Sequence, residues 1–193
     1  TANYEIASIY KIALENNINV VTANKIACSS DYDLYQELKA ICLKNNVKFL
    51  YETNVGAGLP VIGTINDLVN SGDRIQKIEA TVSGSLNFIF NTYDGKNTFH
   101  DVVMDAKKEG YTEPDPRIDL SGVDVKRKIL ILVREAGIKM EFDEIEVKDI
   151  LPKACFEVET VEDFFELLKN DEVTFREMVG NAQLEQKKLR VIA

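Results

Sequence analysis

Apolar residues in the first part of the chain follow two patterns that predict helices and strands in turn. Over Ile6–Leu14 they recur at three- and four-residue spacing, which predicts an amphipathic helix. The short β-branched run at 18–23 is typical of a buried strand. A second helix, which we expect Ser29 and Ser30 to cap, leads to a second strand at 47–52. Two successive helix-then-strand units predict parallel strands joined by helices, as in an open α/β sheet.

Beyond Gly58 the pattern changes and predicts a second region of the α+β class, with helices over one face of a mixed sheet. Helical spacing is found at 59–70, 84–93, 99–109 and 120–136, with further helix starts at Thr160 and Thr174. Alternating or β-branched runs predict strands at 74–83, 145–151 and 187–193. We therefore expect two domains, 1–55 and 56–193.

A polar loop at 110–119 concentrates groups that could bind a ligand. Pro114 and Pro116 each fix a backbone angle, so we expect no helix there. The prolines also restrict the flanking Glu113 and Asp115. A carboxylate held in this way is preorganised to bind an ammonium or hydroxyl group.

The helix after this loop carries Asp124 and Lys128 four residues apart, close enough to interact on one face. The pair is either an ordinary exposed ion pair, which contributes little, or part of a pocket next to the proline loop. The rigid loop favours the pocket. A two-carboxylate hydrolase built on Glu113 and Asp119 is a third alternative, but it leaves Lys128 without a role.

Two polar segments follow the predicted parallel strands, where ligands of open α/β sheets bind. Asn24–Lys25 could reach a phosphate or a polarised oxygen, or the lysine could simply face solvent. NVGAGLP at 54–60 lacks the full G-x-G-x-x-G fingerprint, because position 61 is Val. It is either a glycine turn between strand and helix or a loop whose carbonyls surround a hard cation near Glu52.

Composition excludes several classes of partner. The 193 residues are 45% hydrophobic, and 23 basic against 32 acidic side chains give a net charge of −9. Without a basic stripe we expect no nucleic-acid partner, and without an apolar run of roughly 18 residues no membrane partner. Three widely spaced cysteines without a CxxC pair indicate neither disulfides nor a zinc site and fit a reducing cytoplasm. A single histidine, His100, argues against Ser–His or Cys–His nucleophiles.

Four motifs in this order and spacing resemble homoserine dehydrogenase, especially the form fused behind an aspartate kinase. They are VVTANK, ETNVGAGLPVI, SGSLNFIF and, most specifically, GYTEPDPRIDLSGVDVKRK at 110–128. The resemblance implies NAD- or NADP-dependent interconversion of L-homoserine and L-aspartate 4-semialdehyde, on the route to threonine, isoleucine and methionine. It also implies that 1–55 is part of a Rossmann-like nucleotide-binding domain and that 56–193 binds substrate, catalyses and dimerises.

The resemblance assigns a role to each residue that matches a family position. Lys128 would be the acid and base at the substrate oxygen, because an alkoxide formed by hydride transfer needs a nearby proton donor or cation. The remaining assignments are substrate binding by Glu113, Asp124 and Asp119, cofactor contacts by Thr1 and Lys25, and a monovalent cation such as sodium at Glu52, Val55, Ala57 and Leu59.

The glycine-rich fingerprint of the family's first strand does not occur in this sequence. We therefore expect this piece alone to bind cofactor weakly, to be inactive, and to belong to a longer cytoplasmic, homodimeric protein that includes an aspartate kinase. The alternative is a non-catalytic dimerisation fragment whose acidic loop is merely solvated.

Overall fold

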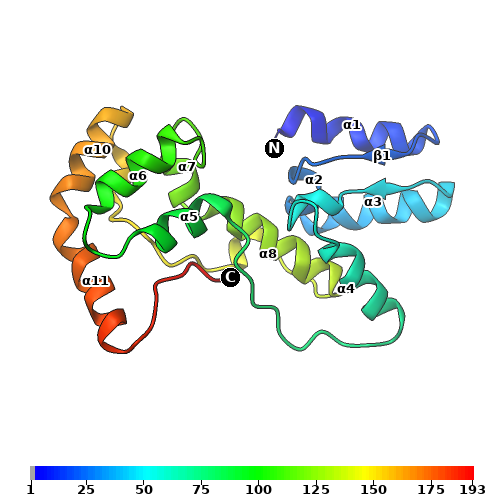
Figure 1. Cartoon of the computed structure of the whole chain (residues 1–193). Coiled ribbons are helices and arrows are strands. Elements are labelled where there is room, and N and C mark those ends of the chain that lie inside the picture. Colours follow the sequence, from blue (N-terminus) through cyan, green and yellow to red (C-terminus); the bar gives the residue numbers. More distant parts are fainter. Residues whose placement is uncertain (1–2) are drawn as a thin grey trace. The chain divides into compact units, whose positions relative to one another are not determined.

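The computed structural model describes residues 3–193 and divides the chain into two compact units (Figure 1). Unit 1 consists of the chain up to Ile78 and of Lys126–Glu146. Unit 2 consists of Glu79–Val125 and Val147–Ala193. Each unit is therefore assembled from two separate stretches of sequence.

Unit 1 has a small parallel sheet covered on one face by helices. Its elements are α1 (Tyr4–Glu15), β1 (Val20–Val21), α2 (Ile26–Ser29), α3 (Tyr32–Asn45), β2 (Phe49–Leu50), η1 (Glu52–Asn54), α4 (Val61–Asn70), α8 (Val123–Glu135) from Lys126 onward, and η2 (Phe142–Glu144). Val20 pairs with Phe49 and Val21 with Leu50 in parallel register. The predicted helix-then-strand order and parallel pairing are confirmed.

A hydrophobic core of unit 1 lies against the covered face of the sheet. Leu14 of α1 and Leu38 of α3 are buried in one cluster, and Val20 and Phe49 pack against it. The register places Val21 and Leu50 on the opposite face, where both are exposed. The inward face of α1 contains Ala7, Tyr10 and Leu14.

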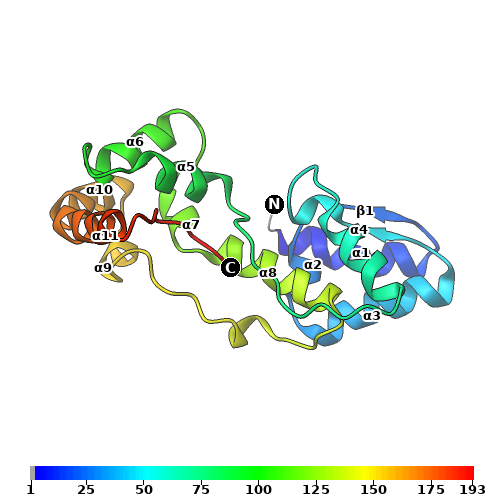
Figure 2. The ribbon, with the colours of Figure 1, turned by 60° about the horizontal axis from the view of Figure 1, so that its bottom comes forward.

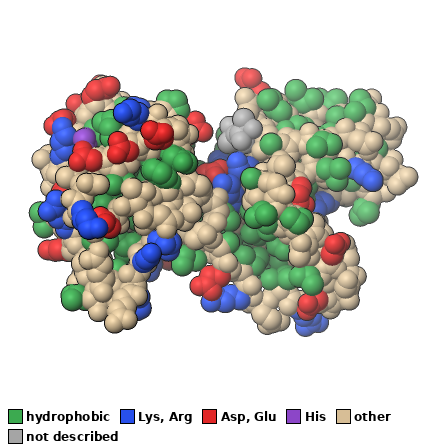
Figure 3. Space-filling view, viewed as in Figure 1, with side chains coloured by type: hydrophobic (Ala, Val, Ile, Leu, Met, Phe, Trp, Pro, Cys, Tyr) green, Lys and Arg blue, Asp and Glu red, His purple; other side chains and the backbone are tan. Residues whose placement is uncertain are grey.

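The apolar pattern of α1 extends beyond its buried face, and the expected cap of the next helix is wrong. Ile6 and Ile9 are exposed, and Figure 3 shows hydrophobic side chains on the surface around α1. Ser29 and Ser30 do not cap α3. They form the end of α2, and Asp31 occupies the N-cap position of α3. The hydroxyl of Ser29 instead donates to the carbonyl of Lys25 at 2.8 Å, one turn back.

Unit 2 is helical in the described residues (Figure 2). Its core contains several aromatic side chains. Its helices are α5 (Gly84–Thr92), α6 (Phe99–Lys108), α7 (Pro116–Leu120), α9 (Ala154–Glu157), α10 (Val161–Asn170) and α11 (Glu172–Leu184), with the first residues of α8. Phe99 stacks on Phe175 with ring centroids 3.9 Å apart, and both are fully buried. Thr160 caps α10, as predicted, whereas α11 begins before Thr174.

The mixed sheet predicted for this region is not formed by residues 3–193. The segments 74–83, 145–151 and 187–193 have no regular secondary structure. Ala80 and Ala193 nonetheless exchange two backbone hydrogen bonds, of 2.9 and 3.0 Å. One such pair does not constitute a ladder, because each strand needs a neighbour along its length.

A short helix lies where the prolines were expected to exclude one. Pro116 is the first residue of α7, a position where a missing N–H breaks no helical hydrogen bond. Asp115 caps this helix by accepting from the N–H of Arg117 at 3.0 Å. No helix in residues 3–193 is both long and apolar enough to span a bilayer.

Candidate active site

Polar groups follow β1 in unit 1, at its carboxyl end. Thr22 Oγ1 accepts from the N–H of Asn24 at 2.9 Å and lies 2.6 Å from the hydroxyl of Tyr10. The Asn24 side chain, which is buried, accepts from the N–H of Ile26 at 3.2 Å. This turn fixes the backbone of Lys25, the half-buried residue that precedes α2.

The same asparagine holds the start of α1. Its amide donates to the carbonyl of Asn3 at 2.6 Å and its oxygen accepts from the N–H of Asn3 at 3.2 Å. The predicted cofactor residue Thr1 lies outside the described residues. Asn24 is thus the residue that joins this strand end to α1.

The four predicted cation positions lie in η1, which begins at Glu52, and in the loop that follows it. Gly56 and Ala57 both have positive φ, of 80° and 53°. The carboxylate of Glu52 accepts from the N–H groups of Ile62 and Gly63, each at 2.8 Å, and so caps α4. The Glu52 side chain is thereby occupied, and its backbone carbonyl accepts from the N–H of Val55 at 3.4 Å.

The remaining carbonyls of that loop suit a cation in kind. No backbone hydrogen bond from residues 3–193 reaches the carbonyls of Val55 and Ala57, and the carbonyl of Leu59 accepts only from Val61 at 2.9 Å. Sodium prefers such hard neutral oxygens. No cluster of three or more His, Cys, Asp or Glu side chains suited to a metal ion occurs in the described chain.

The proline loop in unit 2 is organised by Asp119 rather than by the prolines alone. One oxygen of its carboxylate accepts from the hydroxyl of Ser85 at 2.7 Å, and the other from the N–H of Glu113 at 2.8 Å. The structure therefore brings Glu113 and Asp119 together. Ser85 was not among the predicted site residues, although it lies within the SGSLNFIF motif.

A second carboxylate of this loop is also occupied. Asp115 accepts bidentate hydrogen bonds from Arg117, with the shortest at 2.6 Å, and Arg117 donates further to the carbonyl of Val158 at 2.6 Å. The hydrogen bonds from Arg117 hold the pKa of Asp115 below its usual range. Asp115 and Asp119 thus fix the loop, and Glu113, which is exposed, is the carboxylate at its surface.

The helix α8 carries the other two predicted residues. Asp124 lies in its first turn and Lys128 one turn later, so the two share a face, and both are half-buried. Lys128 belongs to unit 1, whereas Asp124, Glu113 and Asp119 belong to unit 2.

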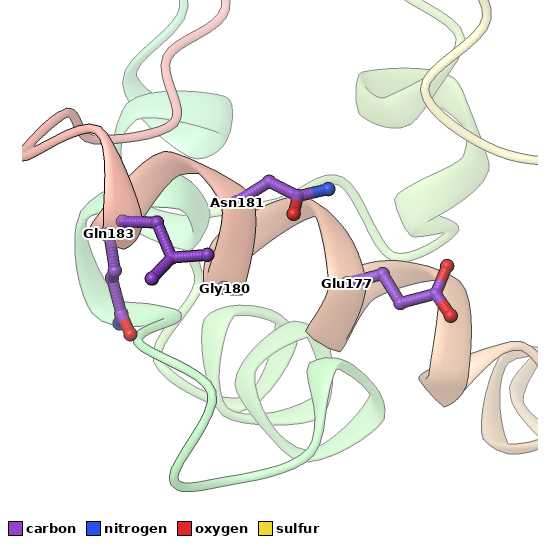
Figure 4. Close-up of a pocket in the computed structure, with 5 residues that line it drawn as sticks. Glu177, Gly180, Asn181 and Gln183 are labelled. Atoms are coloured by element: carbon purple, nitrogen blue, oxygen red, sulfur yellow. The ribbon is translucent and has the colours of Figure 1, made fainter.

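Elsewhere in unit 2 a hollow lies on the surface of α11 (Figure 4). It is lined by Glu177, Gly180, Asn181, Gln183 and Leu184. None of the predicted site residues contributes to it. With one carboxylate and two amides, it offers no acid–base pair for catalysis.

Two family models match adjoining parts of this chain. A family model described as homoserine dehydrogenase matches residues 60–193, and one described as homoserine dehydrogenase, NAD binding domain, matches residues 1–52. The chain is 41% identical over 192 residues to a maize bifunctional aspartokinase/homoserine dehydrogenase 1, chloroplastic, and 42% identical to a bifunctional enzyme of Haemophilus influenzae. It is fully covered in both alignments but spans only 21% and 24% of those relatives.

Two solved structures are similar to this chain in fold and sequence. A Candida auris protein described as of unknown function matches all of this chain and 55% of its own, with a TM-score of 0.92 and 38% identity. A hyperthermophilic archaeal homoserine dehydrogenase in complex with NADPH matches 70% of this chain and 41% of its own, with a TM-score of 0.62 and 34% identity.

Proposed function

Because this chain belongs to the homoserine dehydrogenase family, we propose that the whole protein is an NAD(P)-dependent oxidoreductase that interconverts L-homoserine and L-aspartate 4-semialdehyde. The observation that carries the proposal is the family match over residues 60–193, which includes Glu113, Asp119, Asp124 and Lys128. The bonding of Asp115 and Asp119 argues against the alternative of a merely solvated acidic loop.

In this proposal the residues of 110–128 bind the amino acid and move one proton. NAD(P), when bound, supplies or accepts the hydride. Lys128 donates a proton to the aldehyde oxygen as the carbon is reduced and takes it back in the reverse direction, so no free alkoxide forms. Asp124, one turn away on α8, binds the substrate together with Glu113. Glu113 binds the substrate ammonium, and Asp119 holds the backbone of Glu113 while contributing to the same polar site.

Lys25 and Thr1 are proposed to contact the cofactor and the substrate carbonyl region. Support comes from the position of Lys25 directly after β1, since ligands of open α/β sheets lie beyond the carboxyl ends of the strands. The buried oxygen of Asn54, after β2, has no hydrogen-bond partner within the described residues. An acceptor left in this way suits a site completed by a ligand or by water.

A monovalent cation such as sodium is proposed at the carbonyls of Glu52, Val55, Ala57 and Leu59. The positive φ of Gly56 and Ala57 and the carbonyls of Val55 and Ala57, to which no described N–H donates, support it. A bound cation would stiffen this loop between β2 and α4.

The proposal extends to the organisation of the whole protein. We propose that 1–55 is part of a nucleotide-binding domain and that 56–193 forms a substrate and dimerisation domain with a mixed sheet. The hydrogen bonds between Ala80 and Ala193 support adjacent antiparallel strands there.

We further propose a homodimer fused to an aspartate kinase, as the names of two relatives suggest for the kinase. We place it in a reducing compartment such as the cytoplasm, where Cys28, Cys42 and Cys155 stay free. We expect the 193-residue piece alone to be inactive.

The test is Lys128→Ala in the full-length protein, with Lys126→Ala as the matched control. Lys126 lies on the same helix, with its amine 4.3 Å from the ring centroid of Phe142. We expect Lys128→Ala to lower kcat for homoserine oxidation by about 10²-fold or more while the KM for the cofactor stays the same. Unchanged turnover would exclude Lys128 as the acid and base.

A further inference from the structure

A buried carboxylate lies near the end of α8, two turns beyond Lys128. The side chain of Glu135 is 1% exposed. One of its oxygens accepts from the hydroxyl of Tyr35 at 2.7 Å and from that of Tyr51 at 2.5 Å. The other accepts from the amine of Lys39 at 3.0 Å. We call these four side chains the Glu135 clamp.

The clamp joins three separate elements of unit 1. Tyr35 and Lys39 lie one turn apart on α3, Tyr51 directly follows β2, and Glu135 belongs to α8. A buried carboxylate is tolerated only when charged or hydrogen-bonding groups compensate for its lost hydration. Any rotation of α8 that moved Glu135 away from its three donors would leave an uncompensated buried charge. The clamp therefore resists rotation of α8 about its own axis.

Glu135 shares one face of α8 with Lys128. Seven residues separate them, and seven residues advance about 700° around a helix, within about 20° of two full turns. Ile131, between them on the same stripe, is completely buried. Whatever fixes the direction of Glu135 therefore also fixes the direction in which Lys128 leaves the helix.

The neighbouring Arg134 restrains α8 against movement along its axis. Its guanidinium donates to the carbonyl of Cys28 at 3.0 Å and to the carbonyl of Met140 at 2.9 and 3.1 Å. These bonds hold the end of α8 against α2 and against the turn that follows α8. Arg134 anchors the helix, whereas Glu135 lies on the stripe of Lys128.

We propose that Glu135 is a positioning residue for Lys128, and that Tyr35, Tyr51 and Lys39 act through it by setting the rotation of α8. The inference rests on the proposed function, because it requires Lys128 to act at the reacting oxygen. Proton transfer needs donor and acceptor within hydrogen-bond reach, and a displacement of about 1 Å can lower a rate by about 10²-fold.

A double-mutant cycle in the full-length protein tests the inference. The variants are Glu135→Gln, Lys128→Ala and the double variant, measured for kcat, for KM of homoserine and cofactor, and for melting temperature. Glu135→Gln should lower kcat by about tenfold to a hundredfold with little change in the KM of the cofactor. In the Lys128→Ala background the same substitution should cause no further loss of the residual rate, because its effect runs through the missing amine.

Two further variants keep the test decisive if Glu135→Gln folds poorly. Tyr51→Phe removes one donor and leaves the carboxylate paired with Tyr35 and Lys39, and it should give a smaller fall in kcat that also disappears without Lys128. Glu37→Gln on α3 is the matched control, since it removes an exposed carboxylate bonded to Lys11 at 2.6 Å. It should leave kcat unchanged.

The outcomes separate the two proposals. If Lys128→Ala leaves turnover intact, the proposed function of Lys128 fails. If Lys128→Ala lowers turnover but Glu135→Gln and Tyr51→Phe lower the residual rate by the same factor with or without Lys128, the clamp is structural only and the positioning inference is overturned.

Discussion

The hydroxyl of Ser85 donates a 2.7 Å hydrogen bond to the carboxylate of Asp119, 34 residues further along the chain. The other oxygen of that carboxylate holds the N–H of Glu113. The first turn of α5 thus fixes the backbone from which Glu113 projects. Asp119 acts on the proposed substrate site first of all by shaping the loop.

Replacing Asp119 by Ala should loosen that loop. One part-buried and one exposed hydrogen bond to a charged acceptor are lost, so we expect unit 2 to be destabilised by about 1–2 kcal/mol and the KM for homoserine to rise in the full-length protein. Ser85→Ala should produce a smaller effect, because only one donor disappears. Urea unfolding and steady-state kinetics measure both, and Ser121→Ala, whose hydroxyl bonds only within the adjacent turn, is the control.

Arg117→Lys should destabilise unit 2 even though the charge is kept. A lysine amine cannot reproduce the bidentate contact with Asp115 together with the bond to the carbonyl of Val158. We expect a loss of about 1–2 kcal/mol in the free energy of unfolding. A melting temperature equal to that of the parent protein would contradict this account of the loop.

Gly56→Ala should disturb the loop between β2 and α4. The glycine has a φ of 80°, and an added Cβ would lie 2.7 Å from a methyl of Val61. We expect a destabilisation of about 1–3 kcal/mol, together with weaker stabilisation of the full-length protein by added sodium. Gly58→Ala is the control, because no atom lies within 4 Å of its added Cβ. Equal stability of the two variants would count against strain at Gly56.

The Glu135 clamp should contribute a pH dependence to stability on the acid side. Burial opposes ionisation of Glu135, but the charge of Lys39 and the hydrogen bonds from Tyr51, Tyr35 and Lys39 outweigh it, so its pKa lies below the usual value. Because the folded-state pKa is lowered, the contribution is complete above the ordinary pKa of about 4.3 and is lost as the pH falls through the folded-state value.

The two tyrosines should act on the alkaline side. Burial above all, and then nearby negative charge, raises the pKa of Tyr35 and Tyr51. Their contribution is therefore complete below the ordinary tyrosine pKa of about 10 and declines as the pH rises above it. Urea unfolding from pH 3 to 11 measures both limits. Glu135→Gln should weaken the acid-side slope, and Tyr51→Phe should weaken the alkaline one.

Apolar periodicity predicted the positions of helices and parallel strands better than it predicted which of their residues are buried. The first helix and the parallel strands follow from local spacing, but the exposure of Ile6 and Ile9 does not, because apolar residues recur on more than one side of α1. The mixed sheet is not confirmed for a related reason. A run such as 145–151 forms a strand only if another segment pairs with it, and none does so among residues 3–193.

The sequence indicated individual side chains of the candidate site rather than the contacts between them. The prolines marked the loop at 110–119, yet the contact between Ser85 and Asp119 joins segments that no local pattern links. The Glu135 clamp was missed entirely. Its one sequence signal is the charged pair Arg134–Glu135 directly after a buried apolar run, where charges need partners.

Unit 1 is built from two separate segments of the chain, and this affects how it folds during synthesis on the ribosome. Domains generally fold as units as the chain emerges, the N-terminal one first. Here Lys39, Tyr35 and Tyr51 leave the exit tunnel long before Glu135, so their partner is still untranslated when α3 can first form. Unit 1 can be completed only after Glu146 has been synthesised, by which time Glu79–Val125 is already available to fold.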